Sequence, residues 1–141
     1  MGQQQLLLIV LGVIIVGIAI VVGINLFNAN AVSSNRDGVL SDLQNLAAIA
    51  HQFYVKPSAM GGGENSFVGI TQAWMDANES GLESNANGNY TVSTAGAGTG
   101  TASTVTFQGI GKQLGKDGKT GITMQILVRV PPLSDSLMTV N

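Results

Sequence analysis

The sequence predicts an α+β fold, in which a long N-terminal α-helix packs by its C-terminal half on a small three-stranded antiparallel β-sheet. Two features predict a helix of about 50 residues: an apolar run at residues 6–24, and apolar side chains at three- and four-residue steps through residues 32–54. Three short alternating runs within residues 90–130 predict the sheet. We therefore divide the chain into an apolar helix (1–27), its amphipathic continuation (28–56) and a small β-rich head (57–141).

The first segment is apolar on every side. Residues 6–24 read LLLIVLGVIIVGIAIVVGI, without charge or proline, and fifteen of these nineteen residues are Leu, Ile or Val. A helix rising about 1.5 Å per residue makes this run roughly 28 Å long, close to the hydrocarbon thickness of a bilayer. Because no polar stripe interrupts it, we expect every face to be buried against lipid or other chains. The predicted assembly core consists of Leu6, Leu7, Leu8, Ile9, Val10, Leu11, Val13, Ile14, Ile15, Ile18, Ile20, Val21, Ile24 and Phe27.

Three interpretations of this run are open: a permanent membrane span, a secretory signal peptide, or a span that later packs inside a filament. Ala29-Asn30-Ala31 offers a small-x-small cleavage pattern, but the run is longer than a usual signal core and no Lys or Arg precedes it. A permanent span is usually followed by a cluster of Lys or Arg, whereas the stretch from Asn25 to Asn35 carries no charge. The uncharged flank favours a helix that leaves the bilayer.

Beyond residue 27 the predicted helix gains a polar side. Apolar residues recur from Val32 to Tyr54, while polar residues such as Asp37 and Gln44 occupy the opposite face. Pro57 ends the helix, because the residue before a proline is pushed out of helical geometry. The apolar stripe requires a sheet to cover it.

The head contains three predicted strands, at Tyr90–Thr94, Thr104–Ile110 and Gly121–Val130. A low-complexity loop at 95–103 joins the first two, and Asp117-Gly118 is a turn signal for a hairpin between the last two. Proline ends the last strand at Pro131-Pro132.

Two further parts of the head are predicted to be irregular. Residues 66–74 are expected to dock Phe67, Ile70 and Trp74 onto the helix without regular structure. A polar loop is expected at 76–88, and the tail at 133–141 is expected to be ordered only where it docks on a neighbour.

Composition and motifs give no support for an enzyme, a cofactor or a metal site. The chain has no cysteine, which excludes disulfides and thiolate chemistry. His51 is the single histidine and lacks ligand partners, and Asp76, Glu79 and Glu83 lie in polar surroundings typical of a solvated surface. Gly61-Gly62-Gly63 follows a helix instead of opening one, unlike a phosphate-binding loop. A net charge of −2 gives no basic stripe for nucleic acid.

Two triplets match the acceptor pattern for N-glycosylation: Asn78-Glu79-Ser80 and Asn89-Tyr90-Thr91. The pattern is short and arises readily in a chain rich in Asn and Ser. Asn78 and Asn89 are therefore candidate glycosylation sites.

The arrangement of a near-terminal apolar helix, an amphipathic continuation and a small sheet resembles the type IV pilin family. The resemblance covers the whole architecture, and its specific part is the start, MGQQQLLLIVLGVIIVGIAIVVGI, which looks like a mature pilin helix. It implies an inner-membrane precursor, cleavage by a prepilin peptidase, methylation of the processed N-terminus at Met1, and polymerisation by an ATP-driven assembly machine. The implied product is the major subunit of an extracellular filament on the cell surface, a helical homopolymer.

The chain departs from the family pattern at several points. Most bacterial pilins carry a glutamate at the fifth mature position, whereas this chain has Gln5 if Met1 is the mature terminus, and Leu7 if cleavage follows Gly2. The sequence also lacks a basic leader, which indicates that it begins after processing, and it lacks a C-terminal disulfide loop. We therefore expect a divergent, minimal pilin.

Two other functions remain open at this level: a single-span membrane-tethered binding module and a secretion-system pseudopilin. The uncharged flank after the apolar run argues against the module. The absence of calcium-like acid clusters argues against the pseudopilin.

Because Gln5 is neutral, we predict that assembly tolerates titration of the terminal amine, whose ordinary pKa is about 7.7–8.0. No ion pair between that amine and a fifth-position acid exists to be lost. The amount of sedimentable polymer should stay level as pH rises through this range, and steep dissociation there would contradict the prediction.

Overall fold

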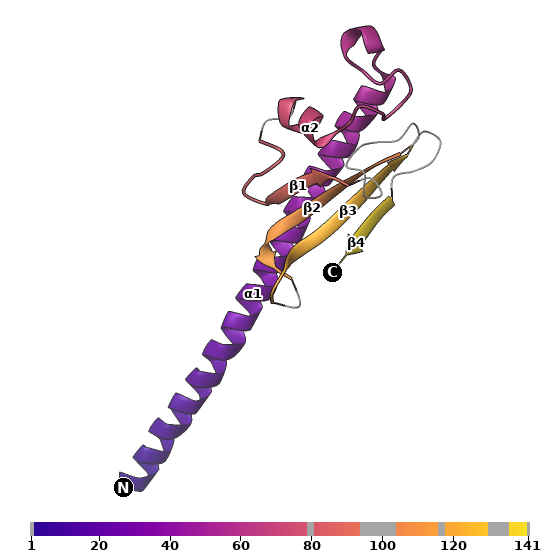
Figure 1. The fold of residues 1–141 in the computed structure, drawn as a ribbon. Coiled ribbons are helices and arrows are strands. Elements are labelled where there is room, and N and C mark those ends of the chain that lie inside the picture. The colour runs from indigo at the N-terminus through magenta and orange to yellow at the C-terminus, as the bar shows by residue number, and fades with distance from the viewer. Residues whose placement is uncertain (1, 79–80, 94–103, 116–117, 130–135, 141) are drawn as a thin grey trace.

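The computed structural model describes residues 2–78, 81–93, 104–115, 118–129 and 136–140, the last of these by backbone only. Figure 1 shows one long helix that projects far beyond the rest of the molecule, with a sheet laid across its C-terminal half. The elements are α1 (Gly2–Val55), the 3-10 turn η1 (Ser58–Met60), α2 (Gln72–Asn78), β1 (Gly88–Val92), β2 (Thr104–Leu114), β3 (Gly121–Arg129) and β4 (Ser136–Val140).

Helix α1 runs for 54 residues without interruption. At about 1.5 Å per residue it is roughly 80 Å long. It ends where the sequence predicts, because Pro57 cannot continue it, although the Lys56 amide still donates to the Gln52 carbonyl at 3.1 Å. The predicted long N-terminal helix is therefore confirmed.

The sheet is antiparallel throughout, with the strand order β1-β2-β3-β4. The α+β fold class, with a long helix packed on a small antiparallel sheet, is confirmed. All three predicted strands are present, with shifted ends: β1 begins at Gly88 and ends at Val92, and β2 continues past a register irregularity to Leu114.

A fourth strand was not predicted from the sequence. Residues 136–140, expected as a tail ordered only on a neighbour, form β4 and pair with β3 of the same chain. Pairing satisfies backbone groups that an edge strand would otherwise leave open, and sequence alternation carries little information about so short a run.

The core lies between α1 and the inner face of the sheet. The apolar stripe of α1 meets alternate residues of β2 and β3, and the strand burial pattern alternates as predicted. Gly109 permits close approach here, since a Cβ on it would lie 2.8 Å from Cγ1 of Val39 and 2.9 Å from the Tyr90 ring. The buried side chains from α1 and these two strands include Val39, Leu43, Leu46, Ala47, Ala50, Phe53, Val105, Phe107, Ile122, Met124, Ile126 and Val128.

The segment before β1 is partly as predicted and partly different. Phe67 and Ile70 are buried as expected, and Trp74 packs edge-on against Phe53 with ring centroids 5.1 Å apart. However, residues 72–78 form helix α2. The predictions of an irregular segment at 66–74 and of a loop at 76–88 were therefore wrong over these residues. Thr71 starts this helix by accepting a hydrogen bond from the Trp74 amide at 3.1 Å, and buried Met75 anchors it.

Some predictions concern residues that the structure does not describe. These are the processed terminus Met1, the loop at 95–103, Asp117 of the hairpin turn and Pro131-Pro132. They stay predictions.

The first test of the fold is the substitution Leu43→Ala at the centre of the stripe. Leu43 is fully buried, so its truncation leaves a cavity and should lower the free energy of unfolding by about 2–5 kcal/mol. Denaturant unfolding of the full chain in detergent can be followed by the fluorescence of Trp74, the single tryptophan. The control Val68→Ala removes an exposed side chain and should change stability by less than about 0.5 kcal/mol. Equal effects of the two substitutions would contradict the packing described.

Candidate functional site

Most of the exposed large apolar side chains of the described residues lie on the N-terminal half of α1, which we call the rod (residues 6–27). Every large side chain of the predicted assembly core is exposed on it, and exposures across the rod run from 52% to 78%. The prediction omitted Val16, Val22 and Leu26, which lie on the rod with the same exposure and belong to the same surface. The signal that would have found them was present, since the run is apolar at those positions too.

No described segment of the chain packs over the rod. The buried residues of α1 begin at Val39, and Figure 1 shows the rod extending clear of the sheet. Of the described helices, α1 alone is long and apolar enough to cross a membrane by length and composition. Burying one such Leu, Ile or Val side chain stabilises a structure by about 1.5–3 kcal/mol. The exposed rod therefore strongly favours insertion into lipid or association with another chain.

A second surface lies where the rod meets the head. We call it the basal notch: a hollow of about 430 Å³ between α1 and the β2–β3 hairpin. Its walls are both apolar and polar. The lining residues are Asn28, Ala29, Val32, Lys112, Gln113, Leu114, Gly115 and Gly118.

Asn35 fixes the hairpin against the helix at this notch. Its Nδ2 donates to the Asn87 carbonyl at 2.7 Å, and its Oδ1 accepts from the Gln113 amide at 3.2 Å. The fit requires glycine at 111, because a Cβ there would collide with the Asn35 side chain. The shape of the notch is thus held by specific polar contacts.

A polar cluster joins α1 to β1 on the same side of the molecule. One oxygen of Asp42, Oδ2, accepts hydrogen bonds from Tyr90 Oη at 2.6 Å, Asn85 Nδ2 at 2.8 Å and Asn87 Nδ2 at 2.9 Å. Burial by itself raises the pKa of the Asp42 carboxyl, but the hydrogen bonds from Tyr90, Asn87 and Asn85 outweigh it and leave that pKa below its ordinary value. Burial and the bond to Asp42 raise the pKa of the Tyr90 hydroxyl. The cluster stabilises an ionised carboxylate and neutral donors, which suits a structural tie between helix and sheet.

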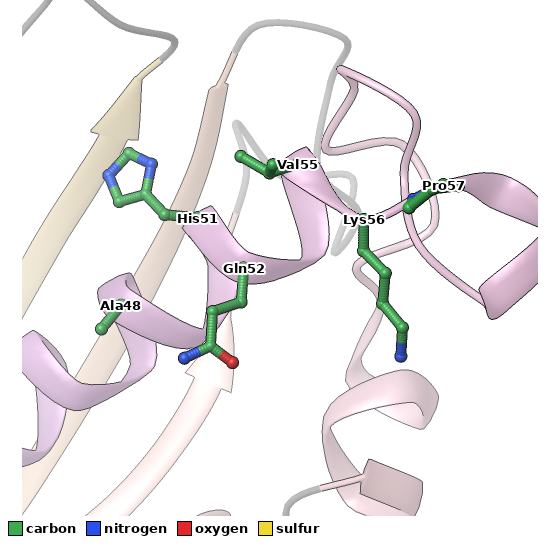
Figure 2. Close-up of a pocket in the computed structure, with 6 residues that line it drawn as sticks. All are labelled: Ala48, His51, Gln52, Val55, Lys56 and Pro57. Atoms are coloured by element: carbon green, nitrogen blue, oxygen red, sulfur yellow. The ribbon is translucent and has the colours of Figure 1, made fainter.

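Close to the far end of α1 lies an open hollow of about 550 Å³. Figure 2 shows His51 and Lys56 projecting from the helix in different directions, so they do not converge on one point. The His51 ring instead lies edge-on to Phe67, with centroids 6.2 Å apart. The lining holds no carboxylate: it consists of Ala48, His51, Gln52, Val55, Lys56 and Pro57.

Two of the three acidic residues singled out in the sequence come together. A hydrogen bond with Asp76 raises the pKa of Glu83, and repulsion between the two carboxyls raises it further. Gln72 Nε2 also donates to Asp76 Oδ1, at 2.9 Å. Glu79 lies outside the described residues. Within the described chain, no group of three or more His, Cys, Asp or Glu side chains is placed to hold a metal ion.

The two candidate glycosylation sites are both exposed. Asn89 lies on β1, where its Oδ1 accepts from Ser84 Oγ at 2.7 Å, and Asn78 ends α2, where its Nδ2 donates to the Trp74 carbonyl at 2.8 Å. Glu79 and Ser80 of the first triplet lie outside the described residues. Glycan attachment stays a prediction at each.

Compared with known proteins, the chain matches no protein-family model, no curated protein sequence and no solved structure. The class that the structure itself defines is therefore architectural: a small α+β head carried on a continuous helix with an exposed apolar rod.

The Asp42 cluster gives a pH-dependent prediction. A carboxyl whose pKa is lowered by folding adds stability above its unfolded pKa of about 3.9, and that stability is lost as pH falls through the folded pKa. The free energy of unfolding should therefore fall as pH drops below about 4, and Asp42→Asn should flatten that part of the profile. Denaturant midpoints at a series of pH values measure both.

Asp37→Asn provides the matched control for this experiment, since it makes the same charge change at an exposed position of α1. It should leave the acid limb of the profile in place. Equal flattening by Asp37→Asn and Asp42→Asn would contradict the role assigned to the cluster.

Proposed function

We propose that this protein is the major structural subunit of an extracellular pilus-like filament similar to those of type IV pilins. Its rod forms the core of the filament and its head forms the outer surface. The observation that carries the proposal is the exposure of large apolar side chains on every face of the rod, joined without a break to a helix that is half-buried in the head.

The charge distribution around the rod supports a transient stay in the membrane. The rod is long enough to span the hydrocarbon layer, and the flank from Asn25 to Asn35 carries no charge to hold it there. Extraction from the bilayer is then offset by packing against the rods of neighbouring copies. A contact between copies that does not close on itself generates a helical filament.

The described residues of the head support a structural role. The head has its own apolar core, and its polar cluster at Asp42 ties α1 to β1 and the loop before it. A head of this kind displays surface and spaces neighbouring copies.

The same proposal includes partners that the pilin resemblance implies. The precursor resides in the inner membrane, a prepilin peptidase removes a leader, Met1 becomes the processed and methylated terminus, and an ATP-driven machine adds subunits. Of the alternatives, a membrane-tethered binding module is compatible with the same rod, since a helix of this length and composition also suits a permanent span, but the uncharged flank argues against it. A secretion-system pseudopilin shares the architecture and differs in the length of the polymer.

Replacing residues 6–24 by a Leu/Ala span of equal length separates the filament from the tethered module. The replacement keeps membrane insertion but changes the shape of every rod-to-rod contact, so we expect filaments seen by electron microscopy to disappear. A matched control, Thr91→Ser on the exposed face of β1, should leave them unchanged.

Two outcomes would contradict the filament. One is a chain with the replaced span that still assembles normally. The other is a wild-type chain that purifies only as single copies, each with its rod in a detergent micelle or lipid.

A further inference from the structure

The two ends of the head differ in shape and in charge, and the difference indicates how copies meet. We propose that the head stacks head to tail on a second copy of the same chain, with the apex of one copy seated in the basal notch of the next. The apex is defined as residues 55–64, which cap the C-terminal end of α1. This inference rests on the proposed filament and names the contact between its heads.

The basal notch has the features of a receptor for a small knob. It is about 430 Å³ in volume, with apolar walls from Ala29, Val32 and the exposed side chain of Leu114. Lys112 stands at its rim. Because the notch begins one residue after Phe27, it is continuous with the exposed apolar surface of the rod, so one neighbouring copy can cover both.

The apex has the features of the matching knob. Val55 and Met60 project from it, 74% and 67% exposed. The loop is held firmly against the last turn of α1: the Gly63 amide donates to the Phe53 carbonyl at 2.8 Å, and the Asn65 amide donates to the Tyr54 carbonyl at 2.8 Å. Gly61, with φ of 78°, provides the left-handed turn that brings the loop back. A preformed knob loses little conformational entropy on docking.

Charge along the chain favours opposite ends as partners. The apex holds one basic and one acidic side chain, Lys56 and Glu64, whereas residues 112–119 hold three lysines and one aspartate. In Figure 1, α2 and the apical loop lie near the C-terminal end of α1, and the β2–β3 hairpin points toward the rod. Head-to-tail stacking therefore brings Lys112 of the hairpin toward Glu64 of the apex, whereas stacking two hairpin ends would oppose like charges.

The length of α1 fits the same arrangement. From Gly2 to Asn28 it has 27 residues, and from Ala29 to Val55 it has another 27. At about 1.5 Å per residue each half is roughly 40 Å long. A copy displaced by one head length therefore lays its head-bearing half level with the rod of the copy it supports. That half can cover one side of the rod along its length.

A disulfide ladder tests the contact directly, since the chain has no cysteine of its own. The full chain carries Gln113→Cys in the notch and Ala59→Cys in the apex, both at exposed positions. Oxidised filaments of the double variant should run as a ladder of multimers on a non-reducing gel. Each single variant should run as a monomer, because equivalent positions in stacked copies lie about 40 Å apart.

Charge reversal tests the orientation. Lys112→Glu and Glu64→Lys should each raise the protein concentration needed for filament formation, by about two- to fivefold at low salt. Combining them should restore the wild-type value. Asp37→Lys makes the same charge change as Glu64→Lys at an exposed position that belongs neither to the notch lining nor to the apex, and it should have no comparable effect. Unfolding midpoints followed by Trp74 fluorescence confirm that each variant is folded.

The outcomes separate the two proposals. Filaments that form without a ladder in the double variant, or with a disulfide-linked dimer from one cysteine alone, overturn head-to-tail stacking and leave the filament standing. A ladder without filaments supports the stacking and contradicts the filament. Single copies alone, with neither ladder nor filament, overturn both.

Discussion

The molecule depends on one constraint, the continuity of a 54-residue helix that is apolar on all sides in one half and on one side in the other. The C-terminal half buries its stripe beneath the sheet, where Leu43 and Leu46 are covered by β2 and β3. The N-terminal half extends the same helix beyond the head, where no described segment of the chain covers its apolar side chains. Because the two halves share one backbone, whatever buries the rod also sets the position of the head. The sheet thus completes the core and fixes the head to the C-terminal half of the helix.

Polar contacts complete what apolar packing begins. The Asp42 oxygen that collects three donors holds β1 and its preceding loop to α1, and Asn35 holds the hairpin to α1 about two turns earlier along the helix. Apolar packing alone would tolerate some sliding of the sheet along the stripe, whereas these bonds specify one register. The basal notch lies beside the second of them. The two Asn35 hydrogen bonds therefore help to define its geometry.

Much of this could be predicted from the sequence, and the failures have physical reasons. The rod, the stripe and the end at Pro57 follow from periods of 3.6 residues and from proline sterics, which act locally. Strand ends were shifted because hydrogen bonding with partners, rather than alternation, decides where β2 stops. Helix α2 was missed because seven residues are too few to show a clear helical period. The Thr71 cap is a local signal that was overlooked, whereas the burial of Met75 arises only in the packed fold. Strand β4 was missed because its formation depends on hydrogen bonding to the edge of β3.

The rod surface was predictable from the sequence. The notch was not, since Val32 and Leu114 come to line one hollow only after the sheet has packed on the helix.

The central claim is that the rod is buried against copies of itself. The most direct measurement is a density map, by electron cryomicroscopy, of the particles that the full-length chain forms, at a resolution that separates helices. The account predicts a long polymer with rods bundled along its axis, heads outside, and Ile14 and Ile18 surrounded by apolar side chains of neighbouring copies. A map with each rod alone in detergent or lipid, or with rods on the outside and heads at the axis, would contradict it.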